Sequence, residues 1–74
     1  MEYTNVRYCD WDDIAAVLAD DRNGVWHAWI HHNGDWKEYE AAEVSHRARL
    51  ITEERFDQLF PGIGMPKELS RQGA

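Results

Sequence analysis

The stretch 25-VWHAWIHHNGDWKEY-39 decides the fold, because it has the pattern of two strands joined by a tight turn. It holds three of the four tryptophans and three of the four histidines, arranged around Asn33-Gly34. Asn-Gly is the strongest two-residue signal for a type I′ turn, since both central residues need a positive φ and these two accept it at low cost. The stretch therefore predicts a β-hairpin with Asn33 and Gly34 as its loop.

A two-residue loop also sets the register of this hairpin. The expected pairs are His32 with Asp35, His31 with Trp36, Ile30 with Lys37, Trp29 with Glu38, Ala28 with Tyr39, and His27 with Glu40. Side chains alternate between the faces of a strand. We expect the core on the face that carries Trp26, Ala28, Ile30 and Tyr39. The other face carries His27, Trp29, His31, Trp36, Glu38 and Glu40.

This second face is aromatic but rich in ionisable groups, which a small core cannot bury without pairing each of them. We therefore predict that Trp29 and Trp36 are exposed and contact a partner. Two alternatives remain open. The two tryptophans could cover a second small core, with the histidines and glutamates at its rim. A three-residue loop with a bulge at Gly34 would instead shift the register by one residue and turn Trp36 toward the core.

The segment before the hairpin predicts a strand followed by a helix. Residues Tyr3–Tyr8 are rich in β-formers, and we expect a short strand there that ends at Cys9. Asp10 is then a suitable helix N-cap, and the acidic residues after it suit the positive end of the helix dipole. Apolar residues at spacings of three and four predict a helix over Trp11–Asp21, packed on the sheet. Gly24 would close that helix in the left-handed conformation.

After the hairpin, residues 40–50 fit both a helical and a strand pattern. Their alanines favour a short helix over Ala41–Ala48 and a final strand at 49–51. Thr52 is predicted to cap a helix over Glu53–Phe60. The fold class is therefore α+β: a small antiparallel sheet built on the central hairpin and packed with two or three short helices. We expect the core to contain Trp11, Ile14, Leu18, Trp26, Ile30, Phe56, Leu59 and Phe60.

Length and composition limit the organisation of the chain. Its 74 residues predict a single small domain over residues 1–69, with residues 70–74 as a flexible tail. A deep private active site is not expected in so short a chain. Cys9 is the single cysteine, so no internal disulfide can form and a reducing, cytoplasmic setting is expected. No apolar run is long enough for a membrane span, and the start of the chain has no signal-peptide pattern.

Charge is unevenly distributed along the sequence. Residues 1–40 carry nine acids and three bases, and residues 41–74 carry five of each, so the net charge of −6 lies in the first half. Direct binding of nucleic acid is disfavoured, because it depends on clustered Lys and Arg. A basic protein surface is the expected partner. The docking face would include Asp12, Asp13, Asp20 and Asp21. The alternative is that these acids only cap the helix and keep the chain soluble.

No motif in the sequence predicts catalysis or a cofactor. His27 opposite Glu40 resembles a base with its orienting carboxylate, but no nucleophile or phosphate-binding loop accompanies them. We expect a non-enzymatic protein with no cofactor and no metal. A zinc or nickel site at His27, Glu40 and a further ligand is an open alternative. The residues expected to bind a partner are Asp12, Asp13, Asp20, Asp21, His27, Trp29, His31, Trp36, Glu38 and Glu40.

In its size, acidity, single cysteine and α+β pattern the chain resembles the small acidic single-domain inhibitors carried by bacteriophages, including anti-CRISPR proteins. The resemblance rests on no signature motif, so it carries over no functional residue. It implies a protein that blocks a nucleic-acid-handling complex by occupying a basic surface, and it allows action as a homodimer. A general cytoplasmic adaptor or regulatory subunit is the alternative, followed by a small histidine-based metal-binding protein.

Overall fold

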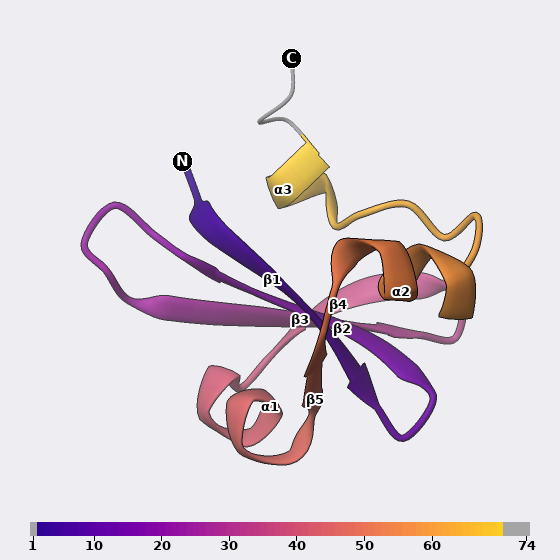
Figure 1. The fold of residues 1–74 in the computed structure, drawn as a ribbon. Helices are drawn as coiled ribbons and strands as arrows, with labels where there is room; N and C mark the ends of the chain where they lie inside the picture. Colours follow the sequence, from indigo (N-terminus) through magenta and orange to yellow (C-terminus); the bar gives the residue numbers. More distant parts are fainter. Residues whose placement is uncertain (1, 71–74) are drawn as a thin grey trace.

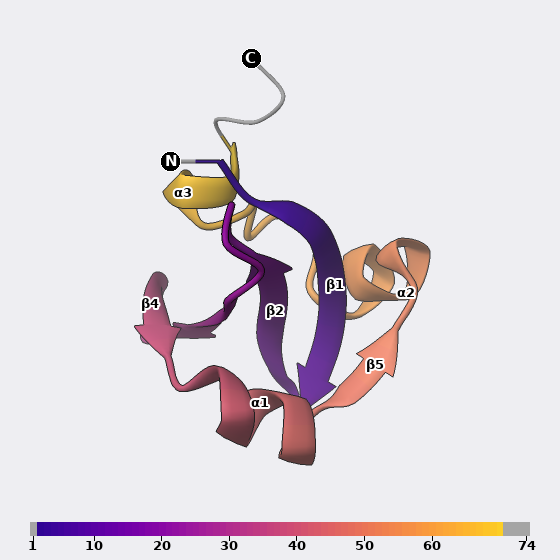
Figure 2. The ribbon, with the colours of Figure 1, turned by 90° about the vertical axis from the view of Figure 1, so that its left-hand side faces the viewer.

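The computed structural model describes residues 2–70, which form an α+β fold around one antiparallel sheet. The sheet has five strands in the order β4-β3-β2-β1-β5. Figure 1 shows α1 on one side of the sheet and α2 and α3 on the other, and Figure 2 shows the same layers from the side. The elements are β1 (Thr4–Trp11), β2 (Ile14–Asp20), β3 (Trp26–His32), β4 (Asp35–Tyr39), α1 (Ala41–Arg47), β5 (Arg49–Ile51), α2 (Glu53–Leu59) and α3 (Lys67–Ser70).

The predicted hairpin is confirmed as β3 and β4. Asn33 has φ 55° and Gly34 has φ 80°, so both loop residues have the positive φ that a type I′ turn needs. Five of the six expected pairs occur in the predicted register, from His32 with Asp35 to Ala28 with Tyr39. The sixth expected pair, His27 with Glu40, is absent from the ladder, because β4 ends at Tyr39 and the chain then enters α1.

The predicted helix over Trp11–Asp21 is wrong, and the predicted end of the first strand at Cys9 is wrong with it. Strand β1 continues to Trp11, and β2 returns beside it after a two-residue turn at Asp12 and Asp13. These two residues have φ 51° and 70°, so they form a second tight turn. The Asp10 carboxylate accepts a hydrogen bond from the Asp13 N–H at 2.9 Å. A helix N-cap makes the same bond three residues ahead, so the sequence pattern fits both structures.

Strand β2 looks helical in the sequence because it is the central strand and is covered on both faces. Residues 15–19 are all buried, including alternate residues that point to opposite sides of the sheet. Such a strand lacks the polar alternation of a half-buried strand and cannot be told from a buried helix by periodicity alone. Gly24 does take the left-handed conformation, with φ 79°, but in the turn between β2 and β3.

Two separate cores lie on the two faces of the sheet. On the face that packs against α1, called the α1 face, the buried cluster is small and consists of Cys9, Ala16, Leu18, Ala28 and Val44. On the opposite face, called the α2 face, the buried cluster is larger and consists of Tyr3, Ala15, Val17, Ala19, Trp29, Phe56 and Leu69. Partly buried residues from the segment between α2 and α3 extend the second cluster, among them Ile63 and Met65.

The elements after the hairpin agree closely with their predictions. Helix α1 and strand β5 occupy the expected segments, and α2 ends one residue earlier than expected. The Thr52 hydroxyl accepts a hydrogen bond from the Arg55 N–H at 3.1 Å, which is the predicted N-cap. The short α3 was not predicted. The predicted flexible tail lies outside the described residues, apart from Ser70 at the end of α3.

The expected core is confirmed only in part. Leu18 and Phe56 are buried as predicted, whereas Trp26 and Ile14 are exposed. The remaining four expected core residues are partly buried, namely Trp11, Ile30, Leu59 and Phe60. Within residues 2–70, no helix combines the length and the apolar character that crossing a membrane requires.

Candidate interaction surface

Large apolar side chains are left exposed on the α1 face. Leu50 pairs with Cys9 and Tyr39 pairs with Ala28, and paired residues share a face, so both side chains point to the side of α1. Trp26 and Ile14 also lie on this face by the alternation along their strands. The exposed fractions are 67% for Leu50, 50% for Trp26, 44% for Tyr39 and 36% for Ile14.

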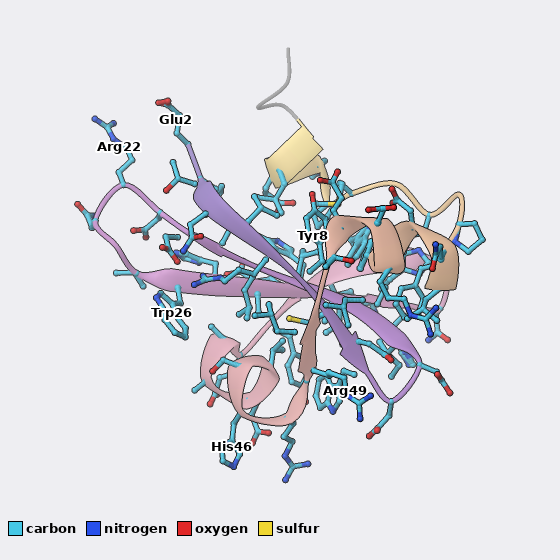
Figure 3. All side chains as sticks on the ribbon, viewed as in Figure 1. Glu2, Tyr8, Arg22, Trp26, His46 and Arg49 are labelled. Carbon is cyan, nitrogen blue, oxygen red and sulfur yellow. The ribbon has the colours of Figure 1, made fainter. Side chains whose placement is uncertain are left out.

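A groove of about 140 Å³ runs between the second half of α1 and the sheet, and we call it the Trp26 groove. Figure 3 labels Trp26 on the side of the sheet where α1 lies. Trp26 and Leu50 are the exposed apolar residues in its lining. The full lining comprises Arg7, Cys9, Leu18, Trp26, Ser45, Ala48 and Leu50. The groove is therefore mainly apolar, with one guanidinium in its wall.

The indole of Trp26 is held in place from behind. The Arg7 guanidinium carbon lies 4.7 Å from the centre of the Trp26 ring, a cation–π arrangement. Arg7 Nη2 donates to the Asp20 carboxylate at 2.6 Å, and the Asn5 amide donates to the same carboxylate at 3.3 Å. The register shift between Thr4 and Arg7 places these side chains together. Trp26 is thus exposed but ordered, which reduces the entropy it would lose in a contact.

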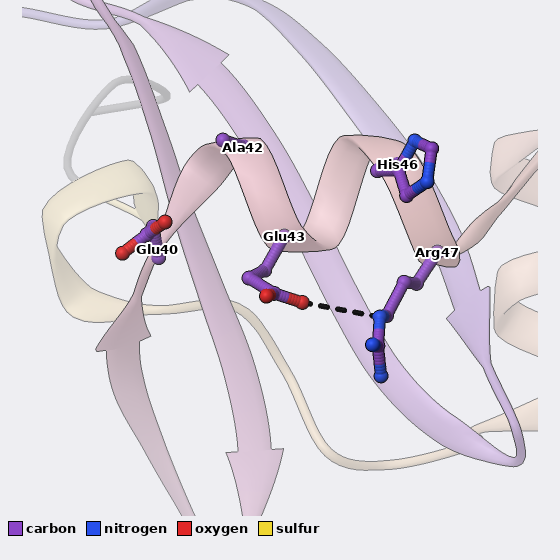
Figure 4. A pocket seen from close by; sticks show the side chains of 5 residues that line it. All are labelled: Glu40, Ala42, Glu43, His46 and Arg47. Atoms are coloured by element: carbon purple, nitrogen blue, oxygen red, sulfur yellow. Dashed lines mark ion pairs between the residues drawn. The ribbon is translucent and has the colours of Figure 1, made fainter.

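A second exposed group, here called the aromatic patch, consists of Trp11 and Tyr39. Their ring centres are 5.4 Å apart in an edge-to-face arrangement, although they come from β1 and β4. Glu40 directly follows Tyr39, and Asp12 directly follows Trp11. Figure 4 shows Glu40, Glu43 and Arg47 along α1, with the ion pair between Glu43 and Arg47 at 3.2 Å.

The prediction that Trp29 and Trp36 form an exposed contact face is wrong. Trp29 is 1% exposed and packs edge-on against Tyr3 at 5.2 Å, and Trp36 is partly buried beside the same cluster. The reason is that α2, α3 and the segment between them cover this face of the hairpin. The open alternative of a second small core with ionisable groups at its rim is the arrangement found. His31 lies at that rim, 5.2 Å from the Trp36 ring.

The ionisable groups at this rim are paired with one another. His27 Nε2 lies 2.8 Å from the Asp21 carboxylate, and His27 Nδ1 lies 3.2 Å from the Glu38 carboxylate. These hydrogen bonds, first the one to Asp21, raise the pKa of His27 above its usual value. The hydrogen bond from His27 and the backbone N–H of Val25 lower the pKa of Asp21. Glu38, and not the expected Glu40, is therefore the carboxylate that His27 contacts on β4.

The four aspartates expected to form one acidic docking face are separated. Asp12 and Asp13 are at the start of β2, whereas Asp20 and Asp21 are at its other end, about 20 Å away at the usual rise of a strand. Asp20 is paired with Arg7, and Asp21 is paired with His27. The helix that would have aligned all four residues does not exist. The exposed acidity of the first half is thus concentrated at Asp12, Asp13 and the β4 end of the hairpin.

Other candidate groups have structural surroundings. Cys9 is buried in the α1-face cluster, and its burial raises the pKa of the thiol. Over residues 2–70, no group of three or more His, Cys, Asp or Glu side chains is placed to hold a metal ion.

Sequence reasoning missed the exposed roles of Trp26, Leu50 and Tyr39. Trp26 and Tyr39 were assigned to the correct face of the hairpin, but that face was taken to be fully covered. The available signal was the size of α1: a helix of seven residues rich in alanine cannot cover a five-stranded sheet. The contact of Arg7 with Trp26 had no signal, because it depends on the pairing of β1 with β2, which was not predicted.

Fold and surface together define a small α+β domain that leaves an apolar, partly aromatic surface exposed on both flanks of α1. The chain matches no protein-family model, no curated protein and no solved structure.

Proposed function

We propose that this chain is a non-enzymatic protein-binding module, and that the Trp26 groove is its main contact with the partner. The observation that carries the proposal is the exposure of Trp26 and Leu50 on the two sides of one groove. Tryptophan is the residue type most enriched at binding hot spots, and anchors are most effective where the free protein already holds them in place. The stacking of Arg7 on Trp26 supplies that order.

The partner we propose is a basic surface of a nucleic-acid-handling protein or complex, which the module would block as an inhibitor. The net charge of −6 supports an electropositive partner, because long-range attraction speeds the encounter. The general resemblance to phage inhibitors supports the same class. The pairing of His27 with Asp21 and Glu38 supports the non-enzymatic part of the proposal, since both ring nitrogens are engaged in holding the turn and β4 together.

The test is capture of partners from nuclease-treated bacterial lysate on the immobilised wild-type chain and on Trp26→Ser and Leu50→Ser variants. Nuclease removes bridging nucleic acid from the lysate. Gln58→Ala is the matched control, because Gln58 is an exposed residue of α2 on the opposite side of the sheet. Circular dichroism establishes that all variants are folded.

The proposal expects one nucleic-acid-handling protein that the wild type and Gln58→Ala retain and that both groove variants lose. Loss of a hot-spot tryptophan typically weakens binding by about 2 kcal/mol or more, which corresponds to roughly thirtyfold. Release by moderate salt is also expected, because exposed charges are screened within about 8 Å at physiological ionic strength. Retention by both groove variants would contradict the proposed groove. Binding through the groove that ignores salt would favour the adaptor class.

A further inference from the structure

We infer that the aromatic patch on the other flank of α1 binds an arginine side chain of a partner protein. This inference deepens the proposed function, because it names the chemistry of a second contact on the same face of the sheet. The patch consists of Trp11 and Tyr39, and the carboxylates of Asp12, Asp13 and Glu40 border it in the sequence.

The two rings of the patch offer a surface for a planar cation. Tyr39 is 44% exposed and Trp11 is partly buried, and their edge-to-face contact at 5.4 Å fixes each ring against the other. An aromatic face attracts a cation through its quadrupole, and tryptophan is the strongest of the aromatic residues in this respect. The rings are therefore ordered before any ligand arrives.

The bordering carboxylates are free to receive a charge. Within residues 2–70, the side chains of Asp12, Asp13 and Glu40 make no hydrogen bond or ion pair. The positive φ values of Asp12 and Asp13 hold both residues at the tip of an exposed turn. The patch thus has aromatic faces and unpaired negative charge but no cation of its own.

The same chain shows how such a set of groups is completed. At the Trp26 groove, the Arg7 guanidinium lies over one aromatic ring at 4.7 Å and is held by one carboxylate at 2.6 Å. The aromatic patch repeats the ring and the carboxylates without the guanidinium. Arginine fits this combination better than lysine, because its planar group stacks on a ring while its N–H groups reach a carboxylate.

Nearby bases of the chain leave the patch open. Arg47 is paired with Glu43, and Arg49 lies near Asp12 and Asp13 without an ion pair to either. Lys37 shares the α1 face of β4 with Tyr39, and it makes no ion pair or ring contact among the described residues. Because Lys37 repels an incoming cation, its removal should strengthen binding.

The test uses NMR titration with the peptide acetyl-Gly-Arg-Gly-Arg-Gly-Arg-amide at low salt. The matched peptide contains citrulline in place of arginine, which keeps the shape and the hydrogen-bond donors but removes the charge. We expect saturable shifts centred on the Trp11 indole N–H and the Tyr39 ring for the arginine peptide, and at least about fivefold weaker binding of the citrulline peptide.

Matched variants locate the charge that matters. The triple variant Asp12→Asn, Asp13→Asn, Glu40→Gln should weaken binding of the arginine peptide about fivefold, as expected for several exposed ion pairs acting together. Asparagine tolerates positive φ, so the turn should be preserved. The control triple variant Glu53→Gln, Glu54→Gln, Asp57→Asn removes the same charge from α2 and should leave the affinity nearly unchanged. Lys37→Gln should raise the affinity about twofold.

Equal weakening by the two triple variants would overturn the inference, since it would reveal general attraction to an acidic protein. Shifts centred on another part of the chain, equal binding of the citrulline peptide, or no binding would also overturn it. These outcomes are separate from a failure of the proposed function, because the peptide experiment needs neither Trp26 nor an identified partner. Conversely, specific peptide binding would stand even if the Trp26 groove captured no partner.

Discussion

Trp26 and Trp29 lie three residues apart on the same strand, but one is half exposed and the other is 1% exposed. An odd spacing places them on opposite faces of the sheet. The α2 face is covered by α2, α3 and the segment between them, which contribute Phe56, Pro66 and Leu69 as buried residues. The α1 face is covered by one helix that contributes a single fully buried large side chain, Val44.

The difference teaches that one sheet can separate stability from recognition. The α2 face buries its aromatic residues and pairs its ionisable groups, which suits a structural core. The α1 face has small residues at its centre, such as Ala16 and Ala28, and these let α1 approach closely while it covers little area. The aromatic residues beside the helix therefore remain available for contacts.

The largest expected effect that tests this comparison is the replacement of each tryptophan by alanine. Trp29→Ala should destabilise the fold by about 3–5 kcal/mol, because it empties the centre of the larger core. Trp26→Ala should cost less than about 1 kcal/mol, because half of its side chain is already in water. Urea unfolding monitored by circular dichroism measures both. Similar losses for the two variants would show that the α1 face is equally important for stability.

A smaller effect is expected from the cover of the α1 face. Val44→Ala should destabilise the domain by about 2 kcal/mol, the value for two buried methyl groups and the cavity they leave. The matched change on the other face, Phe56→Ala, should cost about 3–5 kcal/mol. Thermal unfolding of the two variants gives the comparison. If Val44→Ala were the more damaging change, the assignment of the smaller core to the α1 face would be mistaken.

The sequence predicted the fold class, the register of the β3–β4 hairpin and the elements after it, because each depends on local signals. The Asn33-Gly34 turn and the Thr52 cap act within a few residues of the chain. The pairing of β1 with β2 was missed because β2 is buried on both faces and its turn at Asp12 and Asp13 resembles a helix start. That ambiguity is resolved only by contacts between distant segments.

The candidate surface was less accessible to sequence reasoning than the fold. The alternation of side chains correctly separated the two faces of the hairpin, but it cannot show which face later segments cover. That choice depended on where the chain after Thr52 packs, and its apolar residues at Ile63 and Met65 gave no direction. The predicted contact face and the predicted core face were therefore partly exchanged.

The smallest expected effect concerns the ionisable groups at the rim of the α2 face. The pKa of His27 is raised above its usual value of about 6.5 by its hydrogen bonds to Asp21 and Glu38. Folding therefore favours the protonated ring. Its contribution to stability is fully present below about pH 6.5 and is lost as the pH rises through the higher pKa of the folded state. The pKa of Asp21 is lowered, so its contribution is lost as the pH falls from about 3.8 through the folded value.

The free energy of unfolding, measured in urea from pH 5 to pH 9, should thus decline above about pH 6.5 in the wild type. His27→Gln should remove that part of the decline, because glutamine keeps hydrogen-bonding capacity but does not titrate. His46→Gln is the control, since His46 lies on the exposed side of α1 and makes no ion pair among the described residues. Parallel profiles for the wild type and His27→Gln would mean that the contacts of His27 with Asp21 and Glu38 do not stabilise its protonated form. In that case the α2 face would owe its stability to apolar packing alone, and the contrast with the α1 face would rest on buried area only.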